Sequence, residues 1–359
     1  IAVGVAVLAF GLWFFRPWSP FSPYEVIASR EFMDTVESER TMDQVFPYGQ
    51  IAGAEQPYQF PRAEQPLTVS YQWQGAEKSL DDFIAEASIT GLVVIRDGTL
   101  VHESYYLGET AETLHTSWSV AKSYVATLIG IALKEGKIAS LDDTVEIYAP
   151  QFTGTDYGKA TLRHLLMMSS GIGFDEDYGT RGSDIRKLFF NVFLLNHDID
   201  KQVARFSLAE EPGQRLHYIS PNTHVLSAVV RSVYHKPLAE VAGEKLFQPV
   251  GMGNATWSQD RRGAAGKAIG YCCINTTARD YAKFGQLYLQ DGVWQGTRLL
   301  PDGWVLRADG QDAEEEGRAL RRGFGLVNWY ARVVGYSALV LYGMFGPRLP
   351  VALPVAWIP

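Results

Sequence analysis

The chain has 359 residues, of which 47% are hydrophobic and 20% charged, a composition that indicates a globular protein with a large core and excludes a disordered chain or a fibre. Its formal net charge of −8 argues against a nucleic-acid partner, because binding phosphates requires clustered Lys and Arg. We therefore expect a small-molecule partner. Length alone allows one large domain or two average ones; we expect one and leave the oligomeric state open.

The first fifteen residues carry no charge and are followed by Arg16, Pro17 and Trp18. This pattern is typical of a membrane segment that ends at an aromatic interface, and because the chain starts at Ile1 rather than Met, we expect the segment to extend upstream. A cleaved signal peptide has an apolar stretch of similar length, but no small-residue cleavage site precedes Pro17. We expect an uncleaved membrane anchor over residues 1–22 and a periplasmic location for the rest. Secretion after signal cleavage is the alternative.

The next segment, residues 23–65, is rich in Pro and aromatic side chains, as in EQPYQFPRAEQP, and has weak periodicity. Such a composition predicts a linker rather than packed structure. The linker would lead into a folded domain over residues 66–359.

The folded domain is predicted to begin with a short helix and a hairpin. Ser79, followed three residues later by an acidic residue, predicts the N-cap of a helix over residues 79–89. Two β-rich runs then meet at Asp97-Gly98, a pair favoured in type I′ turns. Residues 91–106 are therefore predicted to form a β-hairpin.

The apolar stretch that begins at Ser119 predicts a long helix ending before Gly136, a residue suited to the left-handed C′ position. Its apolar residues lie on more than one face, which indicates a helix covered on most sides. Residues 140–260 contain further helical runs separated by loops, and residues 277–292 predict one more amphipathic helix. No internal repeat is visible.

Cys272 and Cys273 are adjacent and are the two cysteines of the chain. Neighbouring cysteines rarely close a ring without strain, so the sequence predicts no disulfide framework. No further metal ligands follow close in sequence. We expect both cysteines to be small packing residues, and we expect neither a metal nor a cofactor.

Ser119 and Lys122 have the spacing of a nucleophile and its base. Positions i and i+3 lie on one helix face about 5–6 Å apart, so Lys122 can reach Ser119. A serine hydroxyl is a weak nucleophile until a base removes its proton. A lysine is a base only as a neutral amine, and burial and the positive end of the helix dipole both favour that form. A chance Ser-x-x-Lys is the alternative, but the apolar surroundings in SWSVAKSYVATLIGIAL favour catalysis.

Tyr218 lies in the turn-rich stretch LHYISPNTHVL, just before a predicted helix. A buried tyrosine with a hydrogen-bonded hydroxyl is the ordinary interpretation. Hydrolysis by a serine and a lysine also needs a proton relay to the leaving group, and a phenol can serve.

These motifs resemble those of the serine β-lactamase-like superfamily, which includes class C β-lactamases, penicillin-binding proteins and related esterases. Within it the resemblance points to the 6-aminohexanoate-dimer (nylon-oligomer) hydrolases. It implies an α+β fold, in which an antiparallel sheet built from both ends of the chain is flanked by helices and carries an inserted helical region. Similar stretches between about residues 75 and 305 include SWSVAKSYVATLIGIALKEGKIASLDDTV, TLRHLLMMSSGIGFDEDYG, LHYISPNTHVL and TTARDYAKFGQLYLQDGVWQGTRLLPDGWV.

The resemblance implies that Ser119 is the acylated nucleophile, Lys122 its base and Tyr218 the proton shuttle at the leaving group. His217 and His224 invite a serine–histidine alternative. However, the chain has no Gly-x-Ser-x-Gly elbow and the superfamily uses no histidine base. We expect these histidines, and likewise His115 and His164, to be surface or packing residues.

The resemblance also implies a substrate site. Tyr178 and Asp184 match positions that contact the substrate amide and amine in amide-cleaving relatives, and Asn275 matches a residue that lines their site. The two cysteines fall where close relatives carry Gly-Gly. A third motif, a strand that supplies an oxyanion-hole N–H, matches YSALVLYGMFG, which gives this role to Leu341.

The end of the chain departs from the family pattern. Val340 stands where a glycine is expected and Met344 where a glutamine is expected, and PRLPVALPVAWIP then places Pro where a central strand should run. We expect a truncated or frame-shifted end that leaves an exposed sheet edge and apolar patches.

The sequence therefore predicts a serine hydrolase that cleaves a linear amide or a carboxylic ester through an acyl-enzyme. A β-lactamase or penicillin-interactive esterase is the first alternative, weakened because the chain has no Lys-Thr-Gly or His-Thr-Gly triplet. A catalytically impaired, membrane-tethered homologue is the second, because the third motif is altered.

Overall fold

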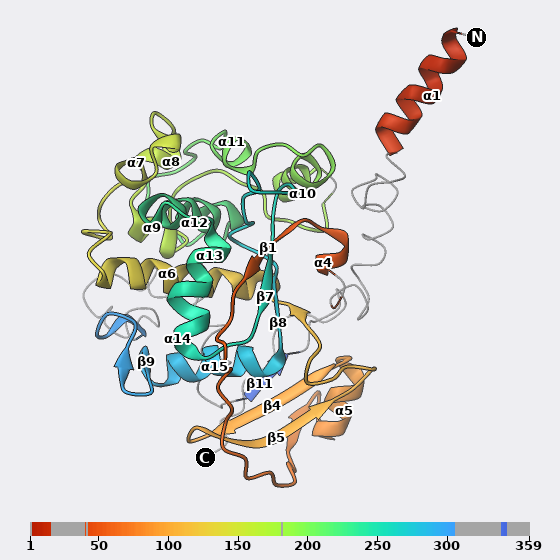
Figure 1. The fold of residues 1–359 in the computed structure, drawn as a ribbon, viewed down its shortest axis with the longest axis vertical. Helices are drawn as coiled ribbons and strands as arrows, with labels where there is room; N and C mark the ends of the chain where they lie inside the picture. Colours follow the sequence, from red (N-terminus) through yellow and green to blue (C-terminus); the bar gives the residue numbers. More distant parts are fainter. Residues whose placement is uncertain (1, 16–39, 41, 181, 306–338, 343–359) are drawn as a thin grey trace.

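The computed structural model describes residues 2–15, 40, 42–180, 182–305 and 339–342 (Figure 1). Its α-helices are α1 (Ala2–Phe15), α4 (Met42–Val45), α5 (Leu80–Glu86), α6 (Ala121–Lys134), α7 (Val145–Tyr148), α8 (Asp156–Lys159), α9 (Leu162–Leu166), α10 (Asp184–Phe189), α11 (Ile199–Val203), α12 (Ser220–Tyr234), α13 (Leu238–Ala242), α14 (Gln248–Val250) and α15 (Ala278–Leu289). Turns of 3-10 helix are η1 (Trp118–Val120) and η2 (Pro150–Phe152), and turns of π-helix are η3 (Phe190–Leu194) and η4 (Gly243–Phe247). The strands are β1 (Tyr48–Ile51), β2 (Ser70–Trp73), β3 (Ala76–Ser79), β4 (Gly91–Arg96), β5 (Thr99–Tyr105), β6 (His115–Thr116), β7 (Ala255–Ser258), β8 (Ile274–Thr276), β9 (Val293–Trp294), β10 (Thr297–Arg298) and β11 (Leu339–Tyr342).

The strands form antiparallel sheets that join distant parts of the chain. One sheet has the order β1-β7-β8-β6 and another the order β11-β4-β5, while β2 pairs with β3 and β9 with β10. Strand β11 runs antiparallel to β4, with Leu341 opposite Leu92. Helices α7 to α12 gather at one end of the molecule, and the β4–β5 hairpin with α5 lies at the other (Figure 1). This arrangement confirms the predicted mixed fold of helices and antiparallel sheets.

Local sequence signals account for the helix and hairpin that precede Ser119. The Ser79 hydroxyl accepts from the Asp82 N–H at 3.1 Å and the Asp82 carboxylate accepts from the Ser79 N–H at 2.8 Å, a reciprocal cap for α5. Asp97 and Gly98 have φ of 50° and 74°, and a type I′ turn requires both to be positive. Both predictions are confirmed.

Helix α6 forms the centre of the core. All of its residues from Ala121 to Ala132 are buried. Tyr124 stacks on Phe284 of α15 with ring centroids 3.9 Å apart, and α12 packs along another face of α6. The α-helix begins at Ala121 rather than at the predicted Ser119, because the preceding three residues form the tighter turn η1.

Helix α1 corrects the predicted membrane anchor over residues 1–22. The helix has 14 residues and is about 21 Å long, whereas the hydrocarbon core of a bilayer is about 30 Å thick. Among the described residues, no helix combines the length and apolar character that crossing a membrane requires. The membrane prediction is therefore wrong, and the periplasmic or secreted location drawn from it is not retained.

Part of the predicted linker is folded. Strand β1 pairs with β7 over four residues, and Ile51 at its end is fully buried. The Arg62 region bridges to Leu100 at the start of β5. Alternating side chains in YGQI give too short a pattern to predict a strand, so its pairing comes from β7 rather than from local sequence. Of the predicted chain end, β11 lies in the sheet, and Met344 and the proline-rich stretch lie outside the described residues.

Candidate active site

Ser119 lies in turn η1, between strand β6 and helix α6. The Ser117 N–H donates to the Ile274 carbonyl at 2.7 Å, and the Ile274 N–H donates to Ser117 Oγ at 3.0 Å. Trp118 has φ 40°, in the left-handed region that bulky side chains rarely adopt. Backbone strain of this kind persists only where the surroundings enforce it, and it is common at functional sites. Strand β8 thus fixes a strained turn that presents Ser119.

Lys122 lies in the first turn of α6, with an exposed fraction of 2%. Its Nζ is 3.0 Å from Ser119 Oγ and donates to the Tyr271 carbonyl at 3.2 Å. As a neutral amine, Nζ can donate to this carbonyl and still accept the Ser119 proton with its lone pair. The structure therefore brings the predicted nucleophile and base within hydrogen-bonding distance.

Tyr218 lies in the loop just before α12 and is partly buried. Its ring centroid is 4.9 Å from Lys122 Nζ, and that of Tyr271 is 5.6 Å from the same atom. Burial, and to a smaller extent the Glu176 carboxylate, raises the pKa of Tyr271 well above its usual range. Ser119, Lys122 and Tyr218 therefore meet at one place, beside a second tyrosine that remains protonated.

Glu176 links two parts of this region that are distant in sequence. Its carboxylate accepts the Tyr178 hydroxyl at 3.0 Å, and it accepts both the N–H at 2.9 Å and the hydroxyl at 2.5 Å of Ser220. Because Ser220 follows Tyr218 by two residues, the carboxylate ties Tyr178 to the Tyr218 loop. Tyr178 itself is 62% exposed, so its ring is open to a ligand.

Asp184 is the first residue of α10, and its contacts lie within its own segment. Its carboxylate accepts from the Asp175 N–H at 3.1 Å and pairs with Lys187 at 3.4 Å. No contact with Ser119, Lys122 or Tyr218 is described, so the geometry gives Asp184 less support than the other predicted residues.

Asn275 lies in β8 opposite Thr116 of β6, three residues before Ser119, and is buried. Its amide nitrogen donates to Thr256 at 2.9 Å, whereas its Oδ1 accepts from no other residue that the structure describes. A buried acceptor without a partner is costly. Leu341 is described through its backbone, which places it in β11 opposite Leu92 of β4.

The cysteines differ from the prediction. Cys272 and Cys273 are joined by a disulfide, with Cα atoms 3.7 Å apart. The backbone at Cys273 is left-handed, with φ 72°, which turns the chain between Tyr271 and β8. The sequence predicted no disulfide because neighbouring cysteines rarely close a ring without strain, and the structure instead joins these two.

His115 and His224 each contact a carboxylate. His115 is buried beside Glu109, with 3.0 Å between Nε2 and Oε1, and His224 is fully buried in an ionic network. His164 is half-buried, and burial lowers its pKa. For His224 the expectation of a packing residue understates its contacts, which are described below.

Two groups at the candidate site were not predicted from the sequence. Glu176 had a weak signal, since it is the second of three acidic residues in FDEDYG and precedes Tyr178. The Tyr271 carbonyl had none, because every residue carries a carbonyl and its role depends only on where the fold places it.

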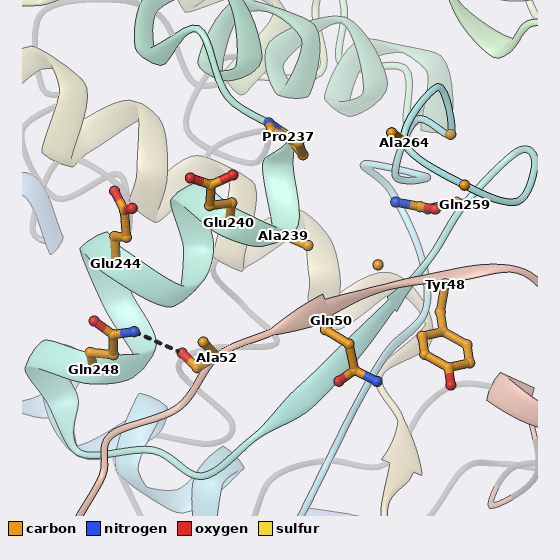
Figure 2. Close-up of a pocket in the computed structure, with 13 residues that line it drawn as sticks. Tyr48, Gln50, Ala52, Pro237, Ala239, Glu240, Glu244, Gln248, Gln259 and Ala264 are labelled. Atoms are coloured by element: carbon orange, nitrogen blue, oxygen red, sulfur yellow. Dashed lines mark hydrogen bonds between the residues drawn. The ribbon is translucent and has the colours of Figure 1, made fainter.

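A pocket elsewhere on the surface lacks this chemistry. It has a volume of about 470 Å³ and lies between β1, α13 and the loop after β7 (Figure 2). Glu240 and Glu244 line it, and both pair with Lys236. None of the predicted catalytic residues lines this pocket, so we do not assign the active site to it.

The fold and the Ser-x-x-Lys geometry define a recognised class of protein. The sequence model of the β-lactamase family matches residues 76–346. The chain belongs to the β-lactamase family.

Individual relatives are named for particular hydrolytic activities. The 6-aminohexanoate-dimer hydrolase of Paenarthrobacter ureafaciens is 27% identical over 232 residues, which cover 63% of this chain and 58% of that protein. A D-aminopeptidase of Cereibacter sphaeroides is 27% identical over 158 residues, 43% of this chain and 28% of the relative. A solved structure from Bacillus anthracis, provisionally named a 6-aminohexanoate-dimer hydrolase, has a TM-score of 0.69 and 25% identity, with 76% of this chain and 73% of that one covered.

The chain thus spans less than two thirds of the length of these two curated relatives. The comparisons confirm the predicted superfamily and the resemblance to 6-aminohexanoate-dimer hydrolases. The hydrolase and peptidase names of the relatives agree with the predicted class of enzyme.

Proposed function

We propose that the chain is a serine hydrolase that cleaves a linear amide or a carboxylic ester through an acyl-enzyme on Ser119. The observation that carries the proposal is the 3.0 Å separation of Ser119 Oγ and Lys122 Nζ at the start of a buried helix. A nucleophile and base at this distance are the signature of covalent catalysis. We assign the catalytic unit to residues 66–359, to which the preceding segment adds β1.

In the first step, Lys122 takes the Ser119 proton while Oγ attacks the substrate carbonyl carbon. The Tyr271 carbonyl accepts an N–H of Lys122, which directs the amine lone pair toward Ser119. The resulting tetrahedral oxyanion would be held by the N–H groups of Ser119 and Leu341. Such donors act where the charge develops, and losing one commonly costs about 100- to 1,000-fold in rate.

Collapse of the intermediate breaks the bond to the leaving group. The proton on Lys122 passes through the Tyr218 hydroxyl to the departing nitrogen or oxygen, which leaves as an amine or alcohol. Water, activated by the same groups, then attacks the acyl-enzyme and releases the acid, and the Ser119 proton is restored. No step of this sequence requires a metal or cofactor.

The residues predicted to contact the substrate favour an amide. The free Oδ1 of Asn275 can accept a substrate N–H, which an ester lacks. Tyr178 offers an exposed ring, and Asp184 would attract a substrate amine. The hydrolase from Paenarthrobacter ureafaciens is named for an amide dimer, which supports a linear amide here.

A fluorophosphonate probe tests the proposal. Wild-type protein should be labelled, and labelling should disappear in Ser119→Ala. Absence of labelling in the wild type would support a catalytically impaired homologue. Hydrolysis of a linear 6-aminohexanoate amide, a p-nitrophenyl ester and a chromogenic cephalosporin should then be compared; faster turnover of the cephalosporin would favour the β-lactamase alternative.

A further inference from the structure

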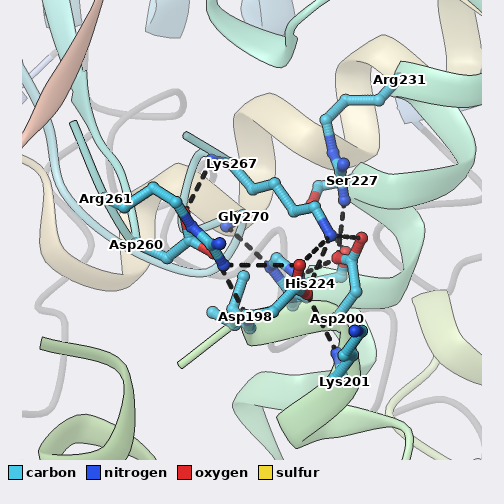
Figure 3. A network of polar contacts seen from close by, with 11 residues as sticks. Asp198, Asp200, Lys201, His224, Ser227, Arg231, Asp260, Arg261, Lys267 and Gly270 are labelled. Carbon is cyan, nitrogen blue, oxygen red and sulfur yellow. Dashed lines mark hydrogen bonds and ion pairs between the residues drawn. The ribbon is translucent and has the colours of Figure 1, made fainter. Parts of the chain in front are cut away.

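A buried ionic network joins helices α11 and α12 to the loop of residues 259–273 (Figure 3). Asp200 of α11 is 5% exposed and lies at its centre. Its carboxylate contacts His224 and Arg231 of α12 at 2.8 and 2.7 Å, and Lys267 of the loop at 2.8 Å. Burial opposes ionisation of Asp200, but the His224 hydrogen bond and the charges of Arg231 and Lys267 outweigh it, so the pKa lies well below its usual range. None of these groups takes part in the proposed reaction.

The first half of the loop is fixed through its backbone. The Lys267 N–H donates to Asp260 at 2.9 Å, and the same carboxylate accepts the Ile199 N–H of α11 at 3.2 Å. Lys267 also pairs with Asp198, the N-cap of α11, at 2.8 Å. The network thus attaches the loop to α11 before it reaches Gly270.

His224 fixes the second half of the loop. Its Nε2 lies 2.8 Å from Asp200 Oδ1, and its Nδ1 is 3.4 Å from the Gly270 nitrogen, whose N–H donates to it. Only a neutral imidazole with its proton on Nε2 can make both contacts. Burial lowers the pKa of His224, which agrees with the neutral form. Asp200 therefore selects the tautomer that leaves Nδ1 free to accept from the loop.

The Gly270 backbone lies directly against α12. A Cβ at this position would be 2.4 Å from Ser227 Oγ, closer than real Cβ contacts, and 3.1 Å from the Cα of His224, a tight contact. Ser227 is itself held, since its hydroxyl donates to the His224 carbonyl at 2.6 Å. Contact and hydrogen bond together define the position of Gly270.

Tyr271, which follows Gly270, contacts the proposed active site. The carbonyl of Tyr271 accepts from Lys122 Nζ at 3.2 Å, and Nζ is 3.0 Å from Ser119 Oγ. A continuous set of contacts therefore runs from Asp200 through His224 and the Gly270–Tyr271 peptide to the proposed base.

We propose that His224, oriented by Asp200, is a positioning residue that holds the Gly270–Tyr271 backbone so that the Tyr271 carbonyl aligns Lys122 with Ser119. The inference rests on the proposed function, because it gives the network a role in activating that nucleophile. His224 itself transfers no proton in the reaction.

Two substitutions separate this role from simple stabilisation. In His224→Asn the amide oxygen can occupy the place of Nδ1 and accept from Gly270, while the bond to Asp200 is lost. In His224→Gln the amide nitrogen can occupy the place of Nε2 and donate to Asp200, while the acceptor for Gly270 is lost. Each variant removes one of the two hydrogen bonds, so melting temperatures should fall by similar amounts.

Catalytic rates should distinguish His224→Gln from His224→Asn. The rate of fluorophosphonate labelling and kcat for a p-nitrophenyl ester should fall about 10-fold or more in His224→Gln, because small misplacements of a catalytic group are expensive, and should stay within about 3-fold of wild type in His224→Asn. KM should change little in either. Equal rates in the two folded variants would overturn the inference.

Further measurements cover the remaining outcomes. If neither variant folds, Gly270→Ala, which keeps every side chain of the ionic network but places a Cβ against Ser227, should label at least about 10-fold more slowly than wild type, and normal labelling would overturn the inference. If the wild type is not labelled, the proposed function fails, and hydrogen exchange then decides on the positioning role. The peptide around Gly270 should exchange faster in His224→Gln than in His224→Asn; equal exchange would overturn it.

Discussion

The proposed site has a helical wall, formed by Ser119 and Lys122 with Tyr218 and Tyr271, and a sheet wall, formed by β11, and the two are held in different ways. Ser119 and Lys122 belong to one helical segment, and Lys122 Nζ contacts the Tyr271 carbonyl, in the loop after β7, and the Tyr218 ring, just before α12. The proposed sheet wall is β11, which among the described strands pairs with β4 alone and so joins residues far apart in sequence.

This difference separates two parts of the chemistry. Activation of the nucleophile depends on contacts that form whenever the core forms. In the proposed mechanism, stabilisation of the oxyanion depends on the non-local pairing of β11 with β4, whose closure costs chain entropy before it gains any contact. We therefore expect substitutions in the helical wall to affect the first proton transfer and substitutions in β11 to affect the transition-state charge.

The largest effect should come from the helical wall. Lys122→Ala removes the proposed base and should lower kcat/KM for an ester substrate by about 1,000-fold or more, and at least as much as Tyr218→Phe, which removes only the relay. The two rates should be measured side by side with circular dichroism as a check of folding. Near-wild-type rates for the lysine variant would refute its role as base.

The sheet wall should give the next largest effect. Leu341→Pro removes the N–H assigned to the oxyanion hole and should lower kcat by about 100-fold, whereas Leu341→Ala keeps that N–H and is the matched control. Among the described strands β11 has a neighbour on one side, and such a strand tolerates proline where its N–H faces away from that neighbour. If the two variants have the same kcat and melting temperature, Leu341 is not an oxyanion donor.

A smaller effect should distinguish amide from ester substrates. Asn275→Ala removes the free Oδ1 and should lower kcat/KM for a linear amide by about 10-fold, the value of one hydrogen bond, with less effect on the matching ester. Kinetics with an amide and ester of the same acyl group would measure the difference. Parallel losses on both substrates would remove Asn275 from amide recognition.

The smallest effect concerns stability and probes the network behind the helical wall. Because burial lowers the pKa of His224, the unfolded chain takes up a proton below about pH 6.5 that the folded chain does not. The stability from neutral His224 is therefore complete above that pH and declines as the pH falls through it. Between about pH 7.5 and 5.5, the melting temperature of wild type should fall more than that of His224→Asn. Equal falls would contradict a neutral His224.

Features set by local chemistry could be predicted from sequence. The cap at Ser79, the turn at Asp97 and Gly98, and the Ser119–Lys122 pair each depend on residues a few positions apart. The role proposed for Asn275 came from the resemblance, which also supported the relay role argued for Tyr218, and the structure adds that the Tyr218 ring lies beside Lys122 and that Asn275 pairs with Thr116.

Features set by the tertiary fold could not be predicted. Strand β1 is too short to show a pattern, and the left-handed backbone at Cys273 gives no signal in the sequence. The Gly270–His224 contact joins positions 46 residues apart through a backbone N–H. For the apolar stretch at the start of the chain, the sequence predicted too much. Hydropathy alone suggested a membrane segment, whereas the helix has only 14 residues.

The most direct test of the central claim is to trap the acyl-enzyme. Wild-type protein mixed with a slowly deacylating ester should be quenched within one turnover, digested and analysed by mass spectrometry. We predict that the mass of the acyl group is found on the peptide that contains Ser119, and that Ser119→Ala shows neither adduct nor turnover. Turnover that proceeds without an adduct and survives the substitution would contradict the account.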